Sequence, residues 1–277
     1  FFTDSFLLSD FFLVRRFLKW KNSYMAKMTQ WMDVVSEMDA AVSMADFRYN
    51  HPEANDAEII DDHVTLSGGE PAPITFEAKN LYHPFLGDKA VKNDFSIQDG
   101  NYYIITGANM AGKSTFLRSL GVNYILAMAG MPVFADSLRV SRFQLFSSMR
   151  TTDDLTHGIS YFNAELLRLE QLLKYCESSK NRTLIILDEI LKGTNSLDKL
   201  NGSRMFLEAI SKHEVSGVIA THDLELSKME QEHPDRFHNY CFEIDLGTDV
   251  TYTYKIQRGV ARNQNATFLL NKILERY

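Results

Sequence analysis

A glycine-rich segment that begins at Gly107 has the residues and spacing of a loop that holds phosphate groups. It reads Gly107-Ala108-Asn109-Met110-Ala111-Gly112-Lys113-Ser114-Thr115 and matches the Walker A pattern G-x-x-x-x-G-K-[ST] at every fixed position. In such a loop backbone N–H groups surround the phosphates, Lys113 reaches the β- and γ-phosphates, and the Ser114 hydroxyl ligates Mg²⁺. A strand-like run at 102–106 precedes the segment and a helix-like run follows it, which disfavours a glycine-rich turn with a surface lysine. The segment therefore predicts a binding site for ATP and Mg²⁺.

Two acidic residues end a second strand-like run. Residues 184–187 are all apolar, and Asp188 and Glu189 follow them directly. A buried strand of this kind would bring Asp188 to the Mg²⁺ ion, while Glu189 would face the attacking water as a general base. Adjacent acids at a strand end are otherwise common as solvated caps, and the upstream glycine-rich loop is what favours the catalytic interpretation.

A histidine ends a third strand-like run, at 217–220, within the sequence Thr221-His222-Asp223. The carboxyl ends of parallel strands open onto one crevice, so His222 would contact the γ-phosphate or orient the attacking water. Alone it would be read as a surface or capping histidine, but its order after the other two motifs favours a functional role. The predicted catalytic residues are therefore Lys113, Glu189 and His222.

These segments resemble the C-terminal ATPase region of MutS-type DNA mismatch-repair proteins, which belong to the ABC-type ATPase superfamily. The resembling stretches are I-T-G-A-N-M-A-G-K-S-T at 105–115, the signature loop at 152–162, L-D-E-I-L-K-G-T-N at 187–195, A-T-H-D-L-E-L at 220–226 and L-Y-H-P at 81–84. The resemblance implies a Mg²⁺-dependent ATPase that forms a homodimer with composite ATP sites. It also implies that Ser160, at the start of a helix, points toward the γ-phosphate held by the partner subunit. A plain helix N-cap is the alternative for Ser160.

The chain departs from the family pattern in and around this site. Pro, Gly and Arg are usual in the family where this chain has Ala108, Ala111 and Lys192. The stretch 90–93 also lacks the aromatic residue that normally stacks on adenine. Tyr82 and His83 are nearby substitutes, with a buried aromatic and a turn histidine as the alternative interpretations.

The elements that position these residues indicate two domains. Between about residues 11 and 48, apolar residues recur three and four positions apart, which is typical of one face of a long helix. Further on, strand-like runs alternate with helix-like stretches, which predicts an α/β fold with a mixed β-sheet flanked by helices, as in a P-loop ABC-type ATPase domain. We expect residues 1–64 to form a helical arm that resembles the end of the MutS core or lever domain, and residues 65–277 to form the ATPase domain.

The expected strands that can be placed from the sequence are 64–66, 74–78, 102–106, 144–149, 183–187, 217–220, 240–246 and 251–256.

Composition and charge restrict the partners and the compartment. The 277 residues are 45% hydrophobic and 23% charged, which is typical of a soluble globular protein, and the net charge of -7 opposes a surface devoted to DNA phosphates. We therefore expect DNA to be bound through regions outside this chain, and the resemblance adds a MutL-type partner.

Charged residues interrupt the apolar stretch at 1–18, so we expect no membrane contact by this segment. Two cysteines without metal-binding spacing favour a reducing, cytoplasmic location.

The expected function is the ATP-binding and ATP-hydrolysing domain of a MutS-like DNA mismatch repair protein, which couples the ATP state of a dimer to DNA-binding parts outside this chain. The alternative is a MutS-like nucleotide-dependent switch or scaffold, tethered to a membrane and acting outside mismatch repair. A transporter ATPase is disfavoured, because the signature-like L-S-G-G-E at 66–70 precedes the phosphate loop instead of following it.

Overall fold

The computed structural model describes residues 9–60, 73–149, 161–178, 182–246 and 250–262. The chain divides into two compact units, Phe1–Pro52 and Glu53–Tyr277, and each is described by itself. The domain boundary expected after residue 64 falls outside the described residues and stays a prediction, as does the expected strand at 64–66.

The first unit contains one long helix, α2 (Ser9–Asn50), of 42 residues. Its sequence contains neither Gly nor Pro, and Pro52 follows two residues beyond its end. Every side chain along α2 is at least partly exposed, including the apolar residues of the predicted face such as Val35 and Val42. In the part of the chain that the structure describes, this and every other helix is too short or too polar to span a membrane.

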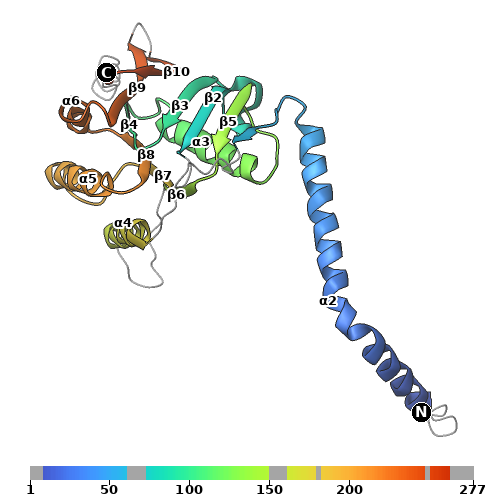
Figure 1. The fold of residues 1–277 in the computed structure, drawn as a ribbon. Helices are drawn as coiled ribbons and strands as arrows, with labels where there is room; N and C mark the ends of the chain where they lie inside the picture. The colour runs from blue at the N-terminus through green and yellow to red at the C-terminus, as the bar shows by residue number, and fades with distance from the viewer. Residues whose placement is uncertain (1–8, 61–72, 150–160, 179–181, 247–249, 263–277) are drawn as a thin grey trace, which may run out of the picture. The chain divides into compact units, whose positions relative to one another are not determined.

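A six-stranded sheet forms the centre of the second unit (Figure 1). Its strand order is β10 (Val250–Arg258), β9 (Phe237–Leu246), β4 (Tyr102–Gly107), β8 (Val215–Thr221), β7 (Thr183–Asp188) and β6 (Gln144–Ser148). Strands β9, β4, β8, β7 and β6 are parallel to one another, and β10 is antiparallel to β9. The sheet is therefore mixed, and each of its strands overlaps a run expected from the sequence.

A second sheet of four strands belongs to the same unit. Its order is β1 (Glu58–Ile60), β5 (Ser137–Ser141), β2 (Thr75–Leu81) and β3 (Asn93–Gln98). Only β2 was expected from the sequence. In β3 the side chains alternate between buried and exposed, and β1 and β5 are only 3 and 5 residues long, so their sequences give a weaker signal than the fully buried strands β4, β7 and β8.

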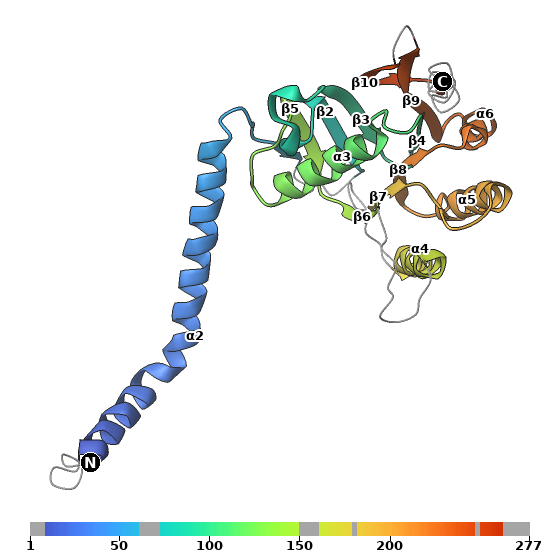
Figure 2. The ribbon, with the colours of Figure 1, turned by 180° about the vertical axis from the view of Figure 1, so that it is seen from behind.

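Helices cover both faces of the six-stranded sheet. Alternate side chains of a strand point to opposite faces: Tyr103 and Ile105 join a core formed with α3 (Lys113–Met128) and the four-stranded sheet. Tyr102 and Ile104 join a second core formed with α4 (Tyr161–Ser178), α5 (Ser196–Ile210) and α6 (Met229–Glu232). Figures 1 and 2 show α4, α5 and α6 on the side of the sheet opposite α3. This arrangement confirms the predicted α/β fold with sheets flanked by helices.

The described residues of this unit also contain two 3₁₀ helices, η1 (Pro84–Lys89) after β2 and η2 (Leu224–Lys228) after β8. His222 lies between β8 and η2.

Candidate active site

The register of three neighbouring strands brings the predicted site residues to one edge of the six-stranded sheet. Thr106 of β4 pairs with Thr221 of β8, and Asp188 of β7 pairs with Ala220 of β8. The backbone N–H of Glu189 donates to the carbonyl oxygen of Ala220 at 2.9 Å. Since the strands are parallel, the glycine-rich loop, the Asp188-Glu189 pair and His222 all leave the sheet at its carboxyl edge.

The glycine-rich loop lies close against β9 and β10. Gly107 has a φ of 154° and Gly112, the N-cap residue of α3, has a φ of 110°. A Cβ atom on Gly107 would lie 2.9 Å from the carbonyl oxygen of Phe242, and one on Gly112 would lie 3.2 Å from the ring of Tyr254. The two glycines of the pattern are therefore required by the backbone conformation and by this close approach.

Lys113 is buried within the loop that it follows. Its Nζ donates to the carbonyl oxygens of Gly107 at 2.7 Å and Ala108 at 2.9 Å, and lies 3.4 Å from Nδ1 of His222. Burial lowers the pKa of Lys113 to about 8, although the carboxylates of Asp188 and Glu189 oppose this shift. The amine of Lys113 thus lies against the loop and His222, and the charges of the two acids reach it.

Both acids of the second motif have a lysine partner. The buried carboxylate of Asp188 lies 4.0 Å from Nζ of Lys192. Glu189 forms an ion pair with Lys199 of α5. Burial raises the pKa of Glu189, but the hydrogen bond and charge of Lys199 outweigh it, so the net pKa lies below the ordinary value. The pKa of His222 is lowered by burial and by the charge of Lys113.

A buried glutamate on α4 holds the segment that follows these acids. Glu165 accepts hydrogen bonds from the backbone N–H groups of Leu191 at 2.7 Å and Lys192 at 3.1 Å. Burial raises the pKa of Glu165, while these two bonds favour its ionised form. Glu165 was not among the predicted site residues, because a single acid in an amphipathic helix gives no sequence signal of this contact.

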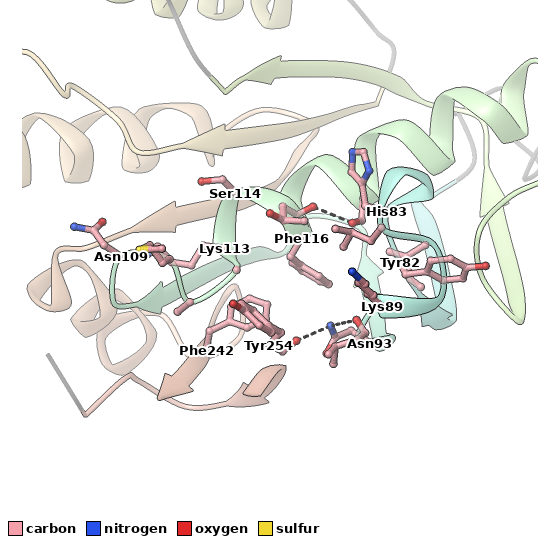
Figure 3. Close-up of a pocket in the computed structure, with 18 of the residues that line it drawn as sticks. Tyr82, His83, Lys89, Asn93, Asn109, Lys113, Ser114, Phe116, Phe242 and Tyr254 are labelled. Atoms are coloured by element: carbon pink, nitrogen blue, oxygen red, sulfur yellow. Dashed lines mark hydrogen bonds between the residues drawn. The ribbon is translucent and has the colours of Figure 1, made fainter. Parts of the chain in front are cut away.

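A pocket of about 460 Å³ opens beside the glycine-rich loop. Residues 109–115 and His222 line one part of it, and Tyr82, His83 and Lys89 line another. Figure 3 shows Asn109, Lys113 and Ser114 on one side of Phe116 and Tyr82, His83 and Lys89 on the other, with Phe242 and Tyr254 along the same pocket. The pocket therefore joins a polar loop suited to phosphates with a wall rich in aromatic side chains.

Tyr82 and His83 line this pocket and also have structural partners outside it. The ring of Tyr82 is buried and packs edge-on against Phe134, with ring centroids 5.6 Å apart. Nδ1 of His83 accepts from the backbone N–H of Phe85 at 3.2 Å and so caps η1. These contacts agree with a buried aromatic and a turn histidine.

Tyr254 is an aromatic lining residue that sequence reasoning missed. It lies at an irregularity of β10 with a φ of 52°, and its carbonyl oxygen accepts from the Asn93 side chain at 3.0 Å. Asn93 also accepts from the N–H of Ile256 at 2.9 Å, so it ties β10 to β3; its bond to Tyr254 is drawn in Figure 3. The alternating Thr-Tyr pattern at 251–254 predicts a strand, but it does not show which tyrosine faces the pocket.

The residues present fit a Mg²⁺ ion that is shared with phosphate. Ser114 lines the pocket and Asp188 offers a buried carboxylate, and hard oxygen donors of this kind suit Mg²⁺. Within the described ranges, no cluster of three or more His, Cys, Asp or Glu side chains could hold a metal. The protein's donors would therefore act together with phosphate and water oxygens.

Ser160 and residues 152–159 of the signature loop lie outside the described residues, as does the L-S-G-G-E stretch at 66–70. Helix α4 begins at Tyr161, directly after Ser160. The role predicted for Ser160 stays a prediction.

Residues 103–268 match the protein family described as MutS domain V, a range that includes the glycine-rich loop, the Asp188-Glu189 pair and His222. The chain is 32% identical over 203 residues to a DNA mismatch repair protein MutS of Thermotoga maritima, covering 73% of this chain and 24% of that protein. It is 27% identical over 242 residues to the protein of the same name of Staphylococcus haemolyticus, covering 86% and 26%. It is 29% identical over 205 residues to MutS protein homolog 4 of Homo sapiens, covering 69% and 21%. The chain thus spans about a quarter of the length of these relatives.

Proposed function

The chain belongs to the MutS family, and on that premise we propose that it is the ATP-binding and ATP-hydrolysing domain of a MutS-like DNA mismatch repair protein, with the P-loop fold of ABC-type ATPases. The observation that carries this proposal is the convergence of Lys113, Asp188, Glu189 and His222 at the carboxyl edge of three adjacent parallel strands. Lys113 and His222 line the pocket, and Asp188 and Glu189 are close enough for their charges to act on Lys113.

Each residue has a distinct role in the proposed reaction. The backbone N–H groups of residues 107–115 and the amine of Lys113 bind the phosphates of ATP. Ser114 and Asp188 hold Mg²⁺, which when bound neutralises charge on the phosphate oxygens. Glu189 accepts a proton from the attacking water, and His222 contacts the γ-phosphate or orients that water.

Phosphate binding requires a change at Lys113. Its amine now donates to the carbonyl oxygens of Gly107 and Ala108, which are neutral acceptors. A phosphate is a stronger, charged acceptor, so we expect ATP to displace at least one of these bonds.

The proposed assembly is a homodimer in which Ser160 of each chain completes the ATP site of the partner. Isologous pairing allows this arrangement, since it places the same surface of both chains at the interface. DNA contacts lie in regions outside this chain, since its net charge of -7 opposes counterion release. A MutL-type partner belongs to the same proposal. The names of the bacterial relatives favour mismatch repair over the alternative of a membrane-tethered switch or scaffold.

The test separates nucleotide binding from hydrolysis. We expect Glu189→Gln to bind Mg-ATP with normal affinity while turnover falls at least about 100-fold, because the amide keeps the shape of the side chain but cannot act as a base. Lys113→Ala should lose ATP binding itself. Calorimetric titration with ATP and an assay of phosphate release measure the two quantities.

Glu170→Gln is a matched control, because it removes an exposed carboxylate on α4 that pairs with Lys174. Normal turnover in Glu189→Gln would remove Glu189 from the catalytic role. Unchanged ATP affinity in Lys113→Ala would contradict the phosphate-binding loop.

A further inference from the structure

Lys199 is a charged residue beside the candidate site that belongs to none of its motifs. It lies in the first turn of α5, where its backbone N–H donates to the carbonyl oxygen of Asn195 at 2.9 Å. Asn195 caps this helix by accepting from the N–H of Asp198 at 3.0 Å. The cap fixes the first turn of α5, and with it the backbone from which Lys199 reaches the end of β7.

The ammonium of Lys199 forms an ion pair and hydrogen bond with Oε1 of Glu189. The two side chains are 18% and 19% exposed, whereas the partners of the surface pair Lys174–Glu170 are 69% and 53% exposed. Sheltered charges lose hydration, and such a pair is stable only when its geometry compensates for that loss. Removing one partner would leave the other charge sheltered and without its nearest counter-ion.

Several other charged groups face Glu189 from different elements. The carboxylate is influenced by His222 after β8 and by Lys192 after β7 as well as by Lys199, and the charge of Glu189 acts in turn on Lys113 of α3. Lys113 and Lys192 are therefore competing cations for the same carboxylate. Without Lys199, Glu189 would be drawn toward one of these two lysines.

We infer that Lys199 is a positioning residue for the proposed hydrolysis: it holds Glu189 through Oε1, so that Oε2 is directed to the attacking water. This inference rests on the proposed function of Glu189 as the general base. A base that is oriented by a third group is a common arrangement in catalysis. Here the third group stands on a capped helix turn, and helices hold functional side chains more precisely than loops do.

The kinetic test compares three variants at a protein concentration high enough for assembly. We expect Lys199→Met to lower kcat about 10- to 100-fold, because a misplaced catalytic group costs this much. The KM for ATP should stay within about threefold, since Lys199 is not proposed to bind the nucleotide. Lys199→Arg restores a cation and should recover most of kcat. Lys174→Met, which removes an exposed lysine from the Lys174–Glu170 pair, should behave as the wild type.

A second measurement uses neither ATP nor Mg²⁺. The melting temperatures of Lys199→Met, Glu189→Gln and the double variant form a cycle that reports whether the two side chains interact. We expect the double variant to lose less than the sum of the two single losses. Lys199→Gln replaces Lys199→Met in both measurements if the methionine variant does not fold.

Additive losses would overturn the inferred pair. Unchanged or increased kcat in Lys199→Met, in a wild-type background that hydrolyses ATP, would overturn only the positioning role. A wild-type protein that binds ATP without hydrolysing it would instead overturn the proposed function. The two failures are therefore distinguishable.

Discussion

The phosphate loop approaches strand β9 so closely that its first glycine has no room for a side chain. The Cβ atom of an alanine at Gly107 would lie 2.9 Å from the carbonyl oxygen of Phe242. That oxygen belongs to the backbone of a strand paired on both sides, by β4 and β10, so it cannot easily move. The absence of a side chain at Gly107 thus allows the phosphate loop to lie this close to β9.

We expect Gly107→Ala to lower the free energy of unfolding by roughly 1–3 kcal/mol, because the added methyl group must displace a packed backbone. Urea denaturation measures this change. Gly100→Ala is the control: it has a φ of 70°, but its Cβ would meet no atom within 4 Å. It therefore reports the cost of backbone strain without a clash. A loss in Gly107→Ala no larger than that in the control would contradict a steric origin.

Strand β9 contains a buried thiol, and its ionisation makes the free energy of unfolding depend on pH. Cys241 is 3% exposed, and burial, together with the charge of Glu243, raises its pKa from 9 to about 11. The folded state therefore keeps the thiol proton more tightly than the unfolded state does. The protonated Cys241 thiol therefore makes its full contribution to the free energy of unfolding below pH 9, and this contribution is lost as the pH rises toward 11.

We expect Cys241 to lower the free energy of unfolding by up to about 2–3 kcal/mol between pH 9 and pH 11, read as the difference between the wild type and Cys241→Ala, because the lowered pKa of Lys113 acts in the opposite direction below pH 10.5. Urea denaturation at a series of pH values measures the fall. Burial also raises the pKa values of Tyr102 and Tyr103, so Cys241→Ala is needed to isolate the thiol. An equally steep fall in Cys241→Ala would show that the thiol is not responsible.

Helix α4 and helix α5 act on the same short segment from two directions. Glu165 of α4 holds the backbone of Leu191 and Lys192, and Lys199 of α5 holds the side chain of Glu189. Glu189 and Leu191 both have positive φ angles, 68° and 57°, which side-chain-bearing residues adopt at a cost. At the scale of secondary-structure elements, contacts from α4 and α5 thus stabilise the backbone conformation of the segment that follows β7.

At the scale of the whole molecule, the proposed dimer makes a prediction about mixed assemblies. If Ser160 serves the partner's site, a heterodimer of Lys113→Ala and Ser160→Ala chains has one site with both defects and one intact site. We expect mixing the two inactive variants to restore roughly a quarter of wild-type activity, because half of the dimers are mixed and each has one intact site of two.

Phosphate release measured before and after subunit exchange at high concentration checks this expectation. A dilution series of the wild type serves as the control, because activity per chain should fall as dimers dissociate. Mixed dimers that form but remain inactive would show that Ser160 acts within its own chain or only as a helix cap.

The sequence by itself determined those parts of the protein whose signals are local. The phosphate loop at 107–115, the acids after the apolar run of β7 and the histidine after β8 are short motifs next to strongly apolar strands. Consecutive buried residues and fixed glycine positions reflect steric and hydration requirements within a few residues, so they can be recognised without the fold. The long helix and the α/β class follow from the same kind of local periodicity.

Only the tertiary structure decided which of these segments meet. The strand order β10-β9-β4-β8-β7-β6 brings together residues far apart in the chain, and Asn93 reaches Tyr254 across 161 positions. The approach of Phe242 to Gly107 depends on that order, and the pairing of Lys199 with Glu189 depends on how α5 packs after β7. Register between distant strands is set by how whole faces pack, and no periodicity within one strand encodes its neighbour.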